Sequence, residues 1–294
     1  REPGKYALYL QHAGIRAAAK LTFPEDEDLD LALVVLHQPV TGIAPSNIPF
    51  HVTTQGETRQ IVGFGITAAG ATNSGIKRQG GITTSTCPEG AAQFICWNFN
   101  PPYVADDQFS NVCSRDSGGP VGTSKDGRLE FEDGVAVRIT PDIDCQSSGM
   151  SWSLALHQHL ELLNSMVEPS ASEDMPLVPD CCGAGVVVLA GDGQLPKPTG
   201  TRYEEWGFEV PPDARVVRVS LNATDVPLSN LELTVRAVEP LPASAGCKDL
   251  GRYESCEYIF ADEPPRSWAA RVENDGGGKV FYQLVVTTFE LPED

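Results

Sequence analysis

The segment Cys113–Pro120, which reads Cys-Ser-Arg-Asp-Ser-Gly-Gly-Pro, most strongly constrains the fold of this 294-residue chain. Two glycines directly after Ser117 permit a tight turn and leave no side chain to block a substrate backbone. Consecutive backbone N–H groups in such a turn can converge on the oxyanion that forms when a serine attacks a carbonyl. Ser-Gly-Gly-Pro is also ordinary turn chemistry, so this segment alone predicts a turn as readily as a nucleophile.

The loop resembles the nucleophile loop of chymotrypsin-family serine proteases, and three other segments agree with it. An Asp precedes an apolar strand that ends at Pro-Val, a Gly-aromatic-Gly pattern opens a strand, and a strand is followed by leucines at helical spacing. These segments are 28–40, 62–67 and 148–167. The resemblance covers about residues 5–167. It implies a chymotrypsin-like double β-barrel with a C-terminal helix, in which the first barrel lacks its N-terminal strands.

The resemblance assigns Ser117 as the nucleophile and Asp30 as the carboxylate that orients a catalytic His. This role requires a buried carboxylate, and we expect the apolar residues after Asp30 to bury it. Taken alone, Asp30 instead reads as the end of a solvated acidic run, Glu25–Asp28. Asp116 matches the Asp that pairs with a newly freed N-terminal amine in the family.

The family's Thr-Ala-Ala-His-Cys type motif, which carries the base, has no match in this sequence. His12 lies too near Asp30, and His37, His51, His157 and His159 stand in other contexts, so none is assigned as the base. We expect a companion N-terminal segment that carries the His and was cleaved off, disordered or truncated. The alternative is a pseudoprotease.

Arg115 stands where the family usually has Gly, at a position that supplies one oxyanion-hole N–H. Arg keeps the N–H, so we expect the backbone of Arg115 and Ser117 to form the hole. A flipped peptide there would leave a poor one. The implied specificity pocket has a neutral residue, Asn111, at its base and a strand along its side, formed by Val137, Arg138, Ile139 and Thr140. Arg115 and Arg138 can favour acidic or polar substrates, or can simply face solvent.

Eight cysteines, an even number, indicate an oxidising compartment and a secreted protein. The resemblance implies the disulfides Cys113–Cys145 and Cys87–Cys96. Cys247 and Cys256 lie close in the sequence and can pair with each other. The adjacent Cys181 and Cys182 can form a vicinal bridge or join other cysteines, and the sequence does not decide between these.

The polar, Pro-rich stretch at residues 168–180 predicts a linker. It separates a protease-like domain at 1–167 (first barrel 1–55, second barrel and helix 56–167) from a domain at 181–294. In the latter, period-2 strands with regular turns predict a β-sandwich. The strand order resembles a bacterial pre-peptidase C-terminal domain. A jelly-roll or immunoglobulin-like spacer predicts the same fold class.

The net charge of −19 argues against nucleic acid and anionic membranes as partners. No stretch is long and apolar enough to cross a bilayer. Together, the two family resemblances and the cysteine content imply a mainly β, secreted bacterial serine endopeptidase, a hydrolase with a zymogen form. It cleaves protein or peptide substrates through an acyl-enzyme and needs no metal or other cofactor. The competing hypothesis is a catalytically inactive, protease-like binding module.

Overall fold

A computed structural model describes residues 6–26, 29–40, 42–43, 46–48, 52–99, 110–125, 128–140, 145, 148–166, 185–197, 203–224, 230–238, 244–246 and 253–290. The chain divides into two compact units, which are described separately. One unit comprises Pro24–Leu31 and Pro45–Glu168, and the other Arg1–Phe23, Ala32–Ala44 and Pro169–Asp294. Residues 1–55 were predicted to belong together, whereas the chain passes between the units at 23/24, 31/32 and 44/45. The predicted linker at 168–180 lies outside the described residues.

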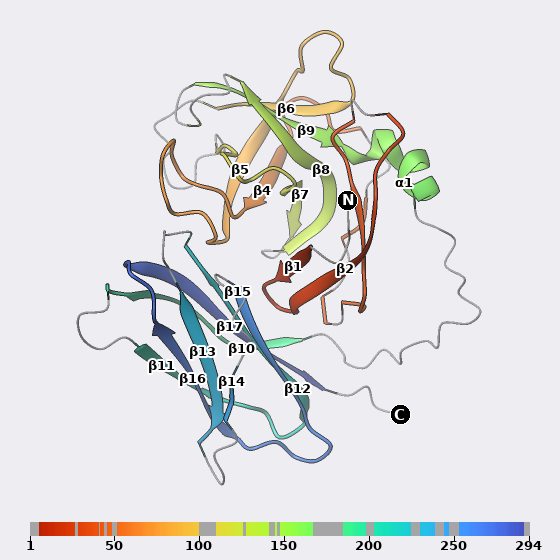
Figure 1. Ribbon diagram of the computed structural model, residues 1–294. Helices are drawn as coiled ribbons and strands as arrows, with labels where there is room; N and C mark the ends of the chain where they lie inside the picture. The colour runs from red at the N-terminus through yellow and green to blue at the C-terminus, as the bar shows by residue number, and fades with distance from the viewer. Residues whose placement is uncertain are drawn as a thin grey trace. The chain divides into compact units, whose positions relative to one another are not determined.

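The first unit contains a closed barrel of six antiparallel strands (Figure 1). In barrel order these are β4 (Thr58–Gly63), β5 (Arg78–Ser85), β6 (Phe94–Phe99), β9 (Gly149–Ala155), β8 (Arg128–Thr140) and β7 (Pro120–Lys125). Pairing of Ile61 with Val121 joins β4 to β7 and closes the barrel, which leaves it without an exposed strand edge. The core cluster consists of the buried residues Ile61, Ile82, Trp97, Val112, Val121 and Ala136.

The helix predicted at residues 154–167 is shorter in the structure. Strand β9 continues to Ala155, a 3₁₀ turn η2 follows at Leu156–His159, and the α-helix α1 spans Leu160–Met166. The strand predicted after Asp30 is also shorter than expected, since β3 spans only Leu33–Leu36. Its Val35 is exposed, although the apolar sequence favours burial. The described residues contain no helix that is long and apolar enough to span a membrane.

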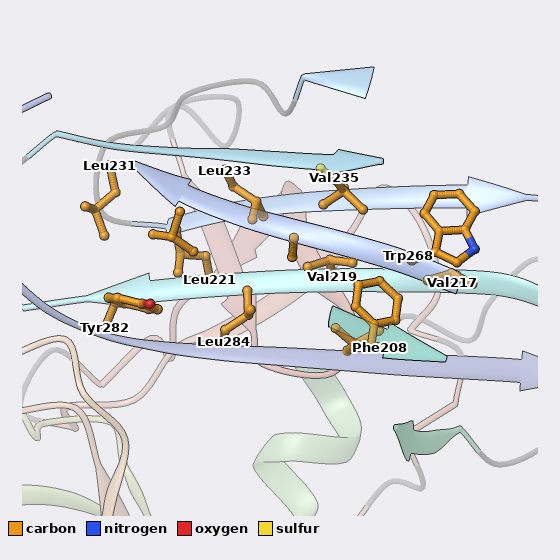
Figure 2. Packing of buried hydrophobic residues seen from close by; sticks show 14 of the residues in the cluster. Phe208, Val217, Val219, Leu221, Leu231, Leu233, Val235, Trp268, Tyr282 and Leu284 are labelled. Atoms are coloured by element: carbon orange, nitrogen blue, oxygen red, sulfur yellow. The ribbon is translucent and has the colours of Figure 1, made fainter. Parts of the chain in front are cut away.

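The second unit contains a two-sheet sandwich. One sheet has the order β10 (Val186–Leu195), β17 (Val280–Glu290), β12 (Ala214–Ala223), β15 (Tyr253–Ile259), and the other β11 (Tyr203–Glu209), β16 (Ser267–Asn274), β13 (Leu231–Ala237), β14 (Ser244–Gly246). Alternate side chains of these strands point inward, as the period-2 pattern predicts. Figure 2 shows the resulting core, in which Leu221 of β12 lies near Leu284 of the paired strand β17.

A three-stranded sheet also belongs to this second unit: β1 (Ala7–Leu10), β2 (Gly14–Thr22) and β3. It contacts the outward face of the β12–β15 pair. The Tyr9 hydroxyl donates to Asn222 Oδ1 at 3.1 Å, and the Tyr9 ring lies 4.8 Å from the Tyr253 ring. Asn222 is fully buried although it points out of the sandwich core. The N-terminal strands are therefore part of the sandwich unit.

The mainly β fold class is confirmed: the described residues contain a six-stranded barrel, the short helix α1 that follows the barrel strands, and a C-terminal sandwich. The part predicted as the remainder of a first barrel is the three-stranded sheet β1–β2–β3.

Leu233→Ala is expected to lower the free energy of unfolding of the sandwich unit by about 2–5 kcal/mol, because the truncation leaves a cavity in a packed core. Leu233 is fully buried. The matched control is Glu232→Ala on the same strand, at an exposed position, which should change the value by no more than about 0.5 kcal/mol. Urea unfolding of both variants measures the difference, and equal effects would contradict the assigned core.

Candidate active site

The segment that carries Ser117 is fixed to the barrel at both ends. At its start, Ser110 N donates to Gly81 O of β5 at 3.0 Å, and the buried Trp97 indole donates to Ser110 O at 3.2 Å. At its end, Gly118 N donates to Ala136 O of β8, and Ala136 N donates back to Gly119 O, both at 2.8 Å. The loop therefore sits on barrel strands that share the core, which is the rigid support a reactive loop needs.

Two disulfides lie in the barrel unit. Cys113–Cys145 ties the loop to the segment after β8, and Cys87–Cys96 closes a short loop onto β6. Both are the pairs that the family resemblance implies. Cys256 is also part of a disulfide, but Cys247, Cys181 and Cys182 lie outside the described residues.

The Asp116 carboxylate joins two loops. Its Oδ1 accepts from Gly65 N at 2.6 Å, and its Oδ2 accepts from Cys113 N at 2.8 Å. Burial raises the pKa of Asp116 above its usual value, whereas the Cys113 and Gly65 amides and the Arg78 guanidinium act in the opposite direction. A β-carbon added at Gly63 would lie 1.9 Å from Asp116 Oδ1, so glycine is needed where the carboxylate passes the backbone.

The Ser114–Arg115 peptide has a fixed orientation. Ile66 N donates to Ser114 O at 3.1 Å. In a trans peptide the C=O and the following N–H point in opposite directions, so the Arg115 N–H points away from Ile66. A flipped peptide would lose this bond.

Arg115 adopts a backbone conformation that is unfavourable for a residue other than glycine. Its φ is +77°, and no other non-glycine residue in the described parts of the chain has a positive φ. The left-handed conformation costs about 1–2 kcal/mol for a residue with a β-carbon. Arg115 Nη1 donates to the buried Ser74 Oγ at 2.7 Å, which offsets part of that cost.

Ser117 is exposed, and neither its hydroxyl nor its N–H forms a hydrogen bond with a residue that the structure describes. No described histidine bonds to it. His12 Nδ1 lies 3.3 Å from Thr287 Oγ1 in the sandwich unit, His157 and His159 lie on η2, and His51 lies outside the described residues. Burial lowers the pKa of His159.

Asp30 belongs to the same unit as Ser117 but is exposed. The expectation that neighbouring apolar residues bury it is wrong for the described chain. The physical reason is that β3 begins only at Leu33, which leaves Asp30 in irregular chain before the strand.

The predicted pocket residues lie on two elements. Asn111 is in the loop, where its Nδ2 donates to Cys145 O at 3.3 Å and its Oδ1 accepts from the Ser151 hydroxyl of β9. Val137, Arg138, Ile139 and Thr140 lie on β8, and the side chains of the last three are outside the description.

A cavity of about 290 Å³ adjoins the loop on the Asp116 side. Its lining includes Ile61, Ile66, Arg78, Asn111, Asp116 and the Cys113–Cys145 disulfide. Asn111, the predicted base of the specificity pocket, is among the lining residues, whereas Val137 is not. In the described residues, no group of three or more His, Cys, Asp or Glu side chains could hold a metal ion.

No protein-family model matches the sequence, and no curated protein matches it. Solved structures with similarity include two mutants of human heparin binding protein (CAP37). One aligns with a TM-score of 0.41 over 53% of this chain and 68% of its own, and the other with 0.40 over 56% and 71%, each at 15% sequence identity. Similarity at this level assigns no activity and no functional residue.

Sequence analysis did not single out Ser74 or Arg78. Both belong to the stretch after the Gly63-Phe64-Gly65 pattern, and the structure brings this stretch against the nucleophile loop. The two glycines signal only the space that Asp116 occupies, since a β-carbon at either position would meet its carboxylate.

Gly63→Ala is expected to displace the Asp116 carboxylate from its two amide donors, because the new methyl group would occupy its position. We expect a loss of about 1–3 kcal/mol in unfolding free energy and faster hydrogen exchange at the Cys113 amide. Gly207→Ala serves as control, since a β-carbon there meets nothing within 4 Å. Unchanged exchange at Cys113 in Gly63→Ala would contradict the assigned role of Asp116.

Proposed function

We propose that this protein is a serine endopeptidase in which Ser117 attacks the carbonyl carbon of a peptide bond. The observation that carries the proposal is the exposed Ser117 hydroxyl on a loop whose flanking residues are all fixed. The Asp116 carboxylate accepts two backbone hydrogen bonds. Gly118 and Gly119 form backbone hydrogen bonds with β8, and the Ser114 carbonyl accepts one from Ile66. An immobilised loop with a solvent-facing nucleophile is the preorganisation that acyl transfer needs.

Two backbone amides are proposed to stabilise the oxyanion. The Arg115 N–H has its direction set by the Ile66–Ser114 hydrogen bond, and the Ser117 N–H has no partner in the described chain. Fixed donors of this kind need no rearrangement as charge develops on the substrate oxygen, and each contributes about 10²–10³ in rate.

The proton of Ser117 requires a base. We propose that a companion N-terminal segment supplies a His, which takes this proton and then passes it to the leaving amine. Water then hydrolyses the acyl-enzyme and restores Ser117. Asp30 is the proposed partner of that His, and the same segment would have to cover its exposed carboxylate. Asp116 is proposed to serve as the receptor of a freed amine in a zymogen transition.

The proposed substrate is a protein or peptide in an extracellular setting. The two described disulfides favour an oxidising compartment. The neutral Asn111 provides no charge to select Lys or Arg side chains. The C-terminal sandwich is proposed to act as a pre-peptidase-like accessory domain of a bacterial enzyme.

The second candidate function is a protease-like binding module without catalysis. It is favoured by two observations: no described histidine forms a hydrogen bond with Ser117, and Asp30 is exposed. The two candidates make opposite predictions for the reactivity of Ser117, because an unactivated serine hydroxyl is a weak nucleophile.

Treatment of the native protein with a fluorophosphonate tests the proposal. We expect a single adduct at Ser117, located by mass spectrometry of peptides and absent from Ser117→Ala. Ser114→Ala removes another exposed serine of the same loop and should keep the adduct. Absence of labelling in the native protein, both before and after limited proteolysis, would refute the endopeptidase and favour the binding module.

A further inference from the structure

The stretch from Gly65 to Ile76 contacts the nucleophile loop at three points. Gly65 N donates to the Asp116 carboxylate, Ile66 N donates to Ser114 O, and Ser74 Oγ accepts from Arg115 Nη1. We call this stretch the clasp. Its three contacts reach Ser114, Arg115 and Asp116, the three residues directly before Ser117, so its conformation determines theirs.

Arg78 holds the clasp together. It is the first residue of β5, and its guanidinium donates to three backbone carbonyls of the clasp. Nη1 donates to Gly65 O at 3.0 Å and to Ile76 O at 3.2 Å, and Nη2 donates to Asn73 O at 3.0 Å. The two ends of the clasp, 65 and 76, thus converge on one nitrogen atom. A planar cation with several fixed donors is suited to this task, and no uncharged side chain supplies the same set.

The position of Arg78 also couples it to the loop electrostatically. Arg78 and Asp116 both line the 290 Å³ cavity. The Asp116 charge favours the charged form of Arg78, although burial lowers the pKa of the guanidinium. Arg78 therefore fixes the Gly65–Ile66 peptide, whose N–H donates to Ser114 O, and it attracts the carboxylate that the Gly65 N–H binds.

We propose that Arg78 is a positioning residue for Ser117. It acts through the clasp and contacts neither the nucleophile nor the oxyanion donors. Removal of the guanidinium would free the clasp, and the Ser114–Arg115 peptide would lose the hydrogen bond that sets its direction. The effect on the reactivity of Ser117 rests on the proposed function, whereas the effect on clasp order does not.

The test compares Arg78→Met with Arg78→Lys and with a matched control. Arg215→Met is the control, because Arg215 Nη1 likewise donates to two backbone carbonyls, Pro212 O and Ala214 O, but lies in the sandwich unit. Amide hydrogen exchange is read at Gly65 and Ile66 and, as internal reference, at the barrel-core residues Ile82 and Trp97.

In Arg78→Met we expect exchange at Gly65 and Ile66 to accelerate at least tenfold, with the core amides changed by less than twofold. Arg78→Lys should give an intermediate rate, since an ammonium has three donors but no planar fork, and Arg215→Met should match the unmodified protein. Unchanged clasp exchange in Arg78→Met would overturn the proposal. An equal acceleration of clasp and core amides would also overturn it, because that result marks general destabilisation. If Arg78→Met does not fold, unchanged clasp exchange in Arg78→Lys would overturn the proposal in the same way.

The rate of fluorophosphonate labelling gives a second readout. If the unmodified protein is labelled at Ser117, Arg78→Met should be labelled at least tenfold more slowly, and an unchanged rate would overturn the positioning role. If the unmodified protein is not labelled, the proposed endopeptidase fails, while the exchange data still decide whether Arg78 orders the clasp.

Discussion

The Asp116 carboxylate is the interaction on which the candidate site depends. It lies half-buried between two segments that are far apart in the sequence. It accepts one backbone hydrogen bond from each segment, from the N–H of Gly65 and from the N–H of Cys113. A carboxylate in such a place is costly unless hydrogen bonds compensate it. Glycines 63 and 65 leave the space for it, and the hydrogen bonds fix the residue directly before Ser117. The site therefore consists of a reactive loop and the clasp, with the barrel strands as their common support.

The N-terminal residues 1–44 are divided between the two units. Strands β1 and β2 contact the outward face of the sandwich sheet, where Tyr9 binds Asn222 and Gly14 passes so close to Ser255 that a β-carbon would clash. Pro24–Leu31, which carries Asp30, belongs instead to the barrel unit. Asp30 and the strand β3 that follows it therefore belong to different units.

Local signals predicted most of the architecture. The alternation in Leu231–Val235 and in Phe281–Val286 correctly indicated strands, because strands with one face in a core show period 2. The Cys113–Cys145 pair followed from the family resemblance. The start of the helix was mispredicted, since Leu154 and Ala155 pair within the barrel as the end of β9 and Leu156 begins the 3₁₀ turn η2. Burial of Asp30 was also mispredicted, because burial depends on neighbours in space that a single stretch of sequence does not reveal.

The roles of Arg78 and Ser74 lay beyond reach from sequence for a similar reason. Hydrogen bonds from a guanidinium to carbonyls leave no residue pattern, since every residue has a carbonyl group. The family resemblance marked Arg115 as a position where glycine is usual but did not predict its backbone conformation. The structure shows that Arg115 adopts a left-handed conformation and that its side chain donates to Ser74.

A crystal structure of the protein after reaction with a peptidyl fluorophosphonate tests the central claim most directly. The account predicts a bond from Ser117 Oγ to phosphorus, with the phosphoryl oxygen within 3.2 Å of both the Arg115 and the Ser117 backbone nitrogen atoms, the usual limit for such a hydrogen bond. A phosphoryl oxygen that faces solvent, or an Arg115 N–H turned toward Ile66, would contradict it.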